Sequence, residues 1–180
     1  MLKPKKQLIR RSEEAILPPY FLSYSTGEMH ISLFTECLDI VFRNHFTRQA
    51  TPEVLQTDES QHDLIVALIQ SCAFGVVCLD GLRPNVIFEY GAMRGAKIPV
   101  LLFKEENAKV DIAHFFGSAG LTLPDNPPIA VDRHFSDTKD RYYISWNRFR
   151  IQETVDAIWD NYSKKRNDIP KYTEIPKPKL

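Results

Sequence analysis

The fold is decided by one stretch of the chain, residues 74–91, whose sequence is FGVVCLDGLRPNVIFEYG. Its first six residues form a continuous apolar run, which is typical of a strand buried on both faces of a sheet. Asp80 ends the run, and Pro84 suits the first turn of a helix, where a backbone N–H would have no intrahelical partner. The stretch therefore predicts a buried strand, a polar turn and a helix that ends near Ala96.

Further strands and helices alternate on both sides of this stretch. Apolar runs predict strands at 20–24, within 46–56, at 98–103 and at 129–131, and helical spacing predicts helices at 28–43, 60–72 and 151–162. Strands that alternate with helices form a parallel sheet with helices on both faces. The predicted fold class is therefore α/β, a flavodoxin-like three-layer α/β/α arrangement around an open parallel sheet of about five strands.

Several aromatic side chains lie close to the last predicted helix and allow two interpretations. They are Tyr142, Tyr143, Trp146, Phe149 and Trp159. One interpretation is a platform for stacking bases. The other, favoured by their helical spacing, is the packing face of the helix.

The length favours one folded domain, which we expect at 19–166, between an N-terminal arm at 1–18 and a C-terminal tail at 167–180. Both ends are basic: residues 1–11 hold five basic and no acidic side chains, and residues 164–180 hold six and two. The middle of the chain carries a formal charge of −9, which argues against a dedicated nucleic-acid binder. We interpret the basic ends as solvated tails.

The cysteines, histidines and apolar runs exclude several kinds of protein. Three cysteines without a CxxC spacing favour free thiols in a reduced, cytoplasmic setting, and Cys78, which has no evident base partner, is interpreted as a core residue. The longest apolar stretch is too short and too interrupted to span a membrane, so no membrane contact is expected. The five histidines have no metal-ligand spacing and no glycine-rich phosphate loop occurs, so we expect neither a metal nor another cofactor.

Polar residues converge on one edge of the predicted sheet. In a sheet of this strand order, ligands bind at the carboxyl ends of the strands where the order reverses, here between the first and third strands. The first strand ends in a hydroxyl-rich turn that contains Ser23, Tyr24 and Ser25, and the third strand ends at Asp80. We expect these residues to line one crevice.

The helix after the third strand is expected to bring an acid to the same crevice. Asn85 and Glu89 are four residues apart, which places both on one face of the helix. Small residues follow, among them Gly91 and Gly95. We therefore expect the helix to lie close to the sheet and to bury Glu89 beside the strand ends.

A nearly buried carboxylate beside a strand end suits chemistry on N-glycosidic bonds. Cleavage of the bond between sugar and base builds positive charge on the sugar, which a carboxylate such as Glu89 stabilises or attacks. Asp80 is the candidate second acid, to protonate or orient the leaving base, and the hydroxyls of Ser23 and Ser25 are candidates to hold a phosphate or a ribose. Each residue also has a plain structural interpretation. The helix dipole favours the negative charge of Glu89 near the helix start, Asp80 caps the turn and Asn85 caps the helix. Ser23 and Ser25 simply end a strand.

The segment 80–91, together with the strand entry that follows it, resembles the signature of the nucleoside 2-deoxyribosyltransferase-like superfamily. Members carry an Asp at a strand end, then Asn-Pro-Asn-Val, then Glu-Leu-Gly and a Gly-Lys-Pro-Val strand entry. Here these become RPNV at 83–86, EYG at 89–91 and AKIP at 96–99. The resemblance implies that Glu89 is the catalytic nucleophile on the sugar carbon, as in the transferases and in related hydrolases of nucleotide N-glycosidic bonds.

The first strand, with the sequence FLSYS at 21–25, also resembles that of Toll/interleukin-1 receptor-like domains. Their NAD-cleaving members carry a catalytic glutamate on the corresponding helix, although the Ser-x-Trp-Cys context of that glutamate is absent here. Many bacterial proteins with this signature look like parts of antiphage systems, which implies a toxic effector. Family members often complete each other's sites across subunits, which implies a homo-oligomer or a subunit of a larger complex.

Three functions follow as hypotheses. The first is an enzyme that cleaves or transfers the N-glycosidic bond of a nucleoside, nucleotide or NAD. For Arg83 two interpretations stand: it selects a phosphorylated substrate, because a guanidinium matches phosphate oxygens, or it is an ordinary surface arginine. The second is a non-catalytic nucleotide-sensing or signalling module of the same fold. The third is a scaffold domain that assembles or docks a partner through its basic ends. The first is the leading hypothesis.

Overall fold

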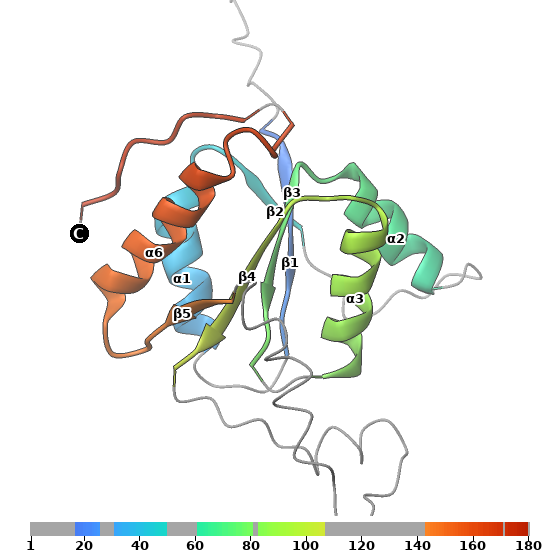
Figure 1. Ribbon diagram of the computed structural model, residues 1–180, viewed down its shortest axis with the longest axis horizontal. Helices are drawn as coiled ribbons and strands as arrows, with labels where there is room; N and C mark the ends of the chain where they lie inside the picture. The colour runs from blue at the N-terminus through green and yellow to red at the C-terminus, as the bar shows by residue number, and fades with distance from the viewer. Residues whose placement is uncertain are drawn as a thin grey trace, which may run out of the picture.

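The computed structural model describes residues 17–25, 31–49, 61–80, 83–106, 143–170 and 172–179 (Figure 1). Within these ranges lie β1 (Pro19–Ser23), α1 (Ile31–Phe42), β2 (Thr47–Gln49), α2 (Gln61–Ser71), β3 (Phe74–Cys78), α3 (Pro84–Gly95), β4 (Val100–Glu105), β5 (Ile144–Trp146) and α6 (Ile151–Lys164). The expectations for 1–16, 28–30, 50–56, 129–131 and Tyr142 concern residues outside the described ranges.

The five strands form one sheet in the order β2-β1-β3-β4-β5, and every pairing is parallel. After β1 the chain moves outward to β2 and then returns past β1 to β3, so the order reverses between β1 and β3. Helices α1 and α6 cover one face of the sheet, and α2 and α3 cover the other (Figure 1). The predicted three-layer α/β/α fold with an open parallel sheet is confirmed.

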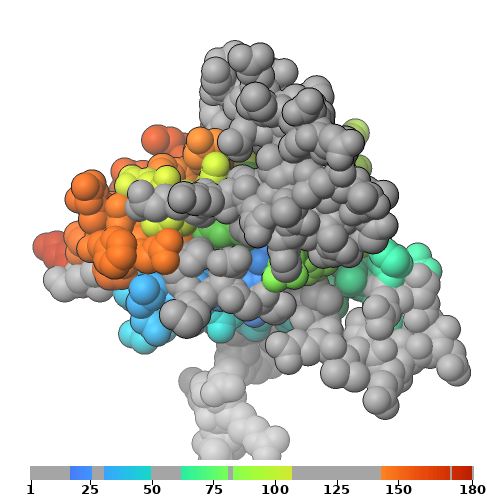
Figure 2. All heavy atoms as spheres, turned by 90° about the horizontal axis from the view of Figure 1, so that it is seen from below, coloured from blue at the N-terminus to red at the C-terminus, as the bar shows by residue number. Residues whose placement is uncertain are grey.

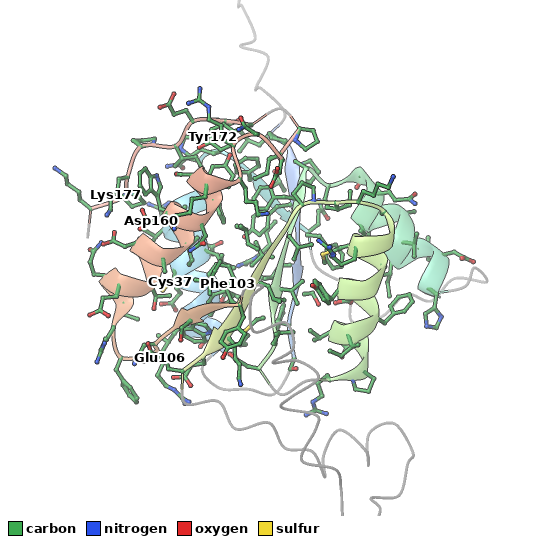
Figure 3. The ribbon with its side chains drawn as sticks, in the orientation of Figure 1. Cys37, Phe103, Glu106, Asp160, Tyr172 and Lys177 are labelled. Carbon is green, nitrogen blue, oxygen red and sulfur yellow. The ribbon has the colours of Figure 1, made fainter. Side chains whose placement is uncertain are left out.

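Each face of the sheet has its own hydrophobic core, because successive side chains of a strand point to opposite faces. The core of the α1/α6 face is large and aromatic and includes Phe74 and Phe103. Figure 3 shows Cys37 of α1 and Phe103 of β4 within this layer. The core of the α2/α3 face is smaller and mainly aliphatic, with Val77 and Met93 among its members.

The strand β5 comes from a stretch that the sequence analysis interpreted as helical. That interpretation of Tyr143, Trp146 and Phe149 is wrong, because α6 begins only after them. Trp146 is buried on β5, whereas Tyr143 and Phe149 are exposed. A strand of three residues is too short for its alternation to stand out against helical spacing. Its pairing with β4, which lies far away in the sequence, decides its conformation.

The C-terminal segment 172–179 is extended but packed, so the solvated-tail interpretation is wrong for this part of the chain. Trp159 Nε1 of α6 donates a hydrogen bond of 2.8 Å to the carbonyl oxygen of Ile175, and the Ile175 side chain belongs to the α1/α6 core. Figure 3 shows Lys177 beside α6, where its Nζ lies 3.3 Å from Asp156 Oδ1. The segment therefore contributes to the folded unit.

Two further features concern the cysteines and the length of the helices. Cys37, Cys72 and Cys78 are buried and free, as the spacing of the cysteines predicted. Among the described residues, every helix is too short or too polar to cross a lipid bilayer.

Candidate functional site

The carboxyl ends of β1 and β3 lie side by side, and polar residues follow both strands. Ser23 closes β1, and Ser25 and Asp80 each come two residues after their strand ends. Ser25 Oγ donates a 2.7 Å hydrogen bond to the carbonyl oxygen of Asp80, and both residues are buried. The bond joins the two chain segments that leave the sheet where the strand order reverses. Figure 2 views this end of the molecule, where the first turns of α1 and α6 lie next to each other.

The Asp80 carboxylate is tied into the sheet. Its Oδ1 accepts a 2.8 Å hydrogen bond from the backbone N–H of Glu105 in β4, and its Oδ2 accepts one of 3.0 Å from Cys78 Sγ. A buried carboxylate is costly unless hydrogen bonds replace those of water, and here the neighbouring strand supplies one of them. Asp80 therefore joins β3 to β4 and does more than cap the turn before α3.

A second buried acid, Glu105, lies at the end of β4 and was missed by the sequence analysis. Its carboxylate is fully buried, and Arg148 Nε and Nη2 lie 3.3 Å from its two oxygens. Arg148 follows β5, and its side chain is 32% exposed. One signal was available: like Asp80, Glu105 is an acid at the end of an apolar run. Together with Asp80 it forms a polar layer across the carboxyl ends of β3, β4 and β5.

Glu89 is the buried acid of α3. Its side chain is 2% exposed and lies in the same helical stripe as Val86 and Met93, which belong to the α2/α3 core. Helix α3 contacts both β1 and β3, so this stripe faces the sheet at the point where the strand order reverses. Glu89 is buried as expected, but Asn85 is exposed. The spacing of four residues therefore does not give the two side chains the same environment.

Helix α3 lies close to the sheet, but for a different reason from the one expected. Gly91 and Gly95 are exposed, and a Cβ atom at either position would meet no heavy atom within 4 Å. The close approach occurs at Gly75 of β3, where a Cβ atom would overlap Met93 Sδ. The missing side chain of Gly75 on the strand allows the close packing, and the two glycines of the helix do not contribute to it.

Ser23 faces α3. Registered neighbours in a parallel sheet point to the same face, and Ser23 pairs with Val77, which packs in the α2/α3 core. Met93 packs over Gly75. Four helical residues rise ~6 Å and two strand residues rise ~6.6 Å, so Glu89 lies about level with Ser23 and Val77. The acid of α3 and the last residue of β1 therefore meet on one face at one height.

The hydroxyl of Ser23 is unusual in its hydrogen bonding. The side chain is 1% exposed, and its Oγ has no hydrogen-bond partner within the part of the chain that the structure describes. A buried donor without a partner costs about 1–3 kcal/mol. Such groups are rare in folded proteins and call for a functional or structural reason.

Arg83 occupies the N-cap position of α3 and is followed by Pro84. Its side chain makes no capping hydrogen bond, and its Nε is buried without a hydrogen-bond partner among the described residues. Asn85 lies inside the helix, so the interpretation of Asn85 as the cap is wrong. The guanidinium is therefore placed at a helix N-terminus, where the helix dipole favours an anion.

Two further residues at the strand ends belong to the opposite face. Tyr24 is half-buried and packs against the α1/α6 core. Cys78 belongs to the same core, and its burial, together with the negative charge of Asp80, raises the pKa of its thiol well above the usual range. The thiol stays protonated at neutral pH and donates to Asp80. Cys78 is therefore a core residue and lacks the thiolate that a nucleophile needs.

The site residues that the sequence indicated thus divide between the faces of the sheet. The first group lies at α3 or on its face of the sheet: Ser23, Arg83 and Glu89. Asp80 and Tyr24 contact the α1/α6 side, and Ser25 bridges the two strand ends. Asn85 is exposed. The first group is the candidate site.

Comparison of the sequence with protein-family models gives no match, and no curated protein matches it at a significant level. The resemblance to the nucleoside 2-deoxyribosyltransferase-like superfamily therefore stays a prediction.

Proposed function

We propose that this protein cleaves or transfers the N-glycosidic bond of a nucleoside, nucleotide or NAD, with Glu89 as the carboxylate that acts on the sugar. The observation that carries the proposal is the position of Glu89, which is 2% exposed on the sheet-facing side of α3, where the strand order reverses. Sheets of this order bind ligands at that point. A carboxylate shielded from water also acts more strongly on a developing positive charge.

The reaction divides between the sugar and the base. When the C1′–N bond breaks, its electron pair goes to the base nitrogen and positive charge develops on the sugar ring. Glu89 either stabilises this charge or attacks C1′ to form a covalent sugar ester. Attack of water on C1′ then breaks the bond to Glu89 and gives hydrolysis, with the water proton passing to the released base, and attack of a second base breaks the same bond and gives transfer.

Two further side chains are suited to bind a polar ligand beside Glu89. Ser23 Oγ and Arg83 Nε are buried donors without hydrogen-bond partners in the described residues. A ribose hydroxyl or a phosphate would satisfy both, and a guanidinium matches phosphate oxygens. Asp80 is assigned to holding the strand ends, because Glu105 and Cys78 already donate to its two oxygens.

A substrate panel tests the proposal. The purified chain is incubated separately with NAD, ribonucleosides, deoxynucleosides and nucleotides, and the free base is measured by chromatography. We expect base release from at least one substrate class and a loss of about 10³-fold or more in Glu89→Gln, because the amide can neither attack C1′ nor balance its charge. Glu106→Gln is the matched control, since Glu106 is an exposed acid at the same end of the sheet.

Two outcomes would contradict the enzyme hypothesis: no base release from any substrate, or equal release by wild type and Glu89→Gln. Calorimetric binding of a nucleotide without turnover would instead support a sensing module of the same fold. The proposal extends to a toxic effector role in antiphage defence. In that case expression of the wild type, but not of Glu89→Gln, arrests a bacterial host and depletes the substrate found in the panel.

A further inference from the structure

A pocket of about 350 Å³ lies at the amino ends of β1 and β2, the opposite end of the sheet from Glu89. It lies between these strand ends and the end of α1. Its polar lining comes from Tyr20, Asp39, Arg43, Thr47 and Arg48. Because three separate elements supply these groups, the pocket is formed by the tertiary fold and not by one local turn.

The pocket has an excess of positive charge. Arg48 Nη1 lies 3.2 and 3.4 Å from the two oxygens of Asp39, so these two charges are paired. Arg43 makes no ion pair with any other described residue, and it brings a second guanidinium to the lining. Within the described residues, Arg43 is therefore a second cation at the pocket, beside the Asp39–Arg48 pair.

A buried phenol completes the polar wall. Tyr20 is 1% exposed and lines the pocket. The guanidinium of Arg48 interacts with its oxygen as a donor, but its O–H has no acceptor in the described part of the chain. Burial raises the pKa of this phenol, although the nearby charge of Arg48 opposes the rise. The hydroxyl therefore keeps its proton and can donate it. Leaving such a donor buried and unsatisfied costs stability, which a ligand acceptor would recover.

Backbone N–H groups already serve two of the last carbonyls of α1. Basic residues after a helix often serve its last carbonyl groups. Here the carbonyl of Asp39 already accepts a hydrogen bond from Arg43 N, and that of Phe42 accepts bonds of 2.8 Å from His45 N and Phe46 N. These two carbonyl groups therefore do not need the guanidinium of Arg43.

We propose that this pocket binds the phosphate group of a small phosphorylated molecule, as a site separate from that of Glu89. A phosphate presents three acceptor oxygens in different directions, and the hydroxyls and guanidinium groups donate from β1, β2 and the end of α1. Leu17 and Phe46 supply an apolar wall for the remainder of the ligand. The volume is at the lower end of the range for ligand pockets, which suits a sugar phosphate.

Calorimetric titration of the full chain at constant ionic strength tests the site with inorganic phosphate, ribose 5-phosphate and acetate as probes. We expect ribose 5-phosphate to bind more tightly than inorganic phosphate, and acetate to bind about 10-fold more weakly than phosphate or worse. Arg43→Gln should weaken both phosphate probes about 10-fold or more, since it removes a charge-assisted contact. Arg94→Gln, at an exposed position on α3, is the matched control and should change neither affinity.

Tyr20→Phe gives a second, independent readout. It should lower the affinity for phosphate several-fold because one donor is lost. It should also raise the thermal midpoint of the ligand-free chain, because it removes a buried O–H that has no acceptor among the described residues. The proposal is overturned if no phosphate probe binds, or if binding is the same in wild type, Arg43→Gln and Tyr20→Phe.

Discussion

The two faces of the sheet are packed in different ways. On the α1/α6 face, the Phe74 ring stands among Tyr20, Phe42, Phe46 and Tyr162, with ring centroids 5.0 to 5.5 Å away. On the α2/α3 face, the core is smaller and mainly aliphatic, and it includes a buried acid in α3. One face therefore concentrates the burial that stabilises the fold.

The α2/α3 face also carries polar costs, as the buried Tyr20 hydroxyl does on the α1/α6 face. The carboxylate of Glu89, and the Ser23 hydroxyl that has no partner among the described residues, are polar groups in places where apolar side chains would pack at lower cost. Proteins commonly carry such costs at functional sites. The difference between the faces indicates that the aromatic core of the α1/α6 face stabilises the fold, while the α3 side carries the candidate catalytic residues.

The largest effect is expected from the aromatic face. Phe74→Ala removes the ring that contacts four others and should lower the free energy of unfolding by about 3–5 kcal/mol. Val77→Ala, three residues along the same strand on the α3 face, should cost only about 2 kcal/mol because it removes less buried surface. Urea denaturation measures both. An equal loss in the free energy of unfolding for the two substitutions would contradict the proposed difference between the two faces.

A smaller effect is expected where the α1/α6 side meets the carboxyl ends of the strands. Arg148→Met leaves the buried Glu105 carboxylate without this guanidinium and should lower the free energy of unfolding by about 2–3 kcal/mol. Arg150→Met is the control, because Arg150 pairs with Glu153 at the surface, where both side chains are more than half exposed. It should cost less than about 0.5 kcal/mol. Indistinguishable urea midpoints for the two variants would contradict a structural role for the Glu105 pair.

The smallest effects on stability test how α3 packs on β3. Gly75→Ala places a Cβ atom against Met93 and should destabilise by about 1–3 kcal/mol. Gly91→Ala has open space around it and should stabilise by about 0.5–1 kcal/mol, because alanine favours the helix. Thermal unfolding compares them, and Met93→Ala as a second substitution should relieve much of the Gly75→Ala cost. The same sign for both glycines would show that α3 does not pack on β3 at Gly75.

Much of the fold could be predicted from local patterns. The apolar runs and helical stripes located β1, β3, β4 and α3 to within a few residues, because buried strands and amphipathic helices have distinct periods. The strand β5 was not recognised, because three residues carry too little pattern. The packing of 172–179 was also missed, since it depends on hydrogen bonds from α6 that no local signal records.

The candidate site was predicted only in part. The sequence placed Glu89 correctly in the second turn of the helix after β3, because the helical period alone sets that position. It did not separate Ser23 from Tyr24, which face opposite sides of the sheet, or indicate that the backbone N–H of Glu105 donates to Asp80. These contacts join strands that are neighbours in the sheet but distant along the chain.

By itself, the sequence determined the alternation of strands and helices and the turn of α3 on which Glu89 lies, since both follow from the spacing of apolar side chains. Only the tertiary structure decided which polar groups share a face. The register of β1 against β3 turns Ser23 toward α3, and Gly75 lets α3 approach closely enough to bury the acid. The physical reason is that burial and hydrogen bonding depend on neighbours in space, whereas periodicity depends on neighbours along the chain.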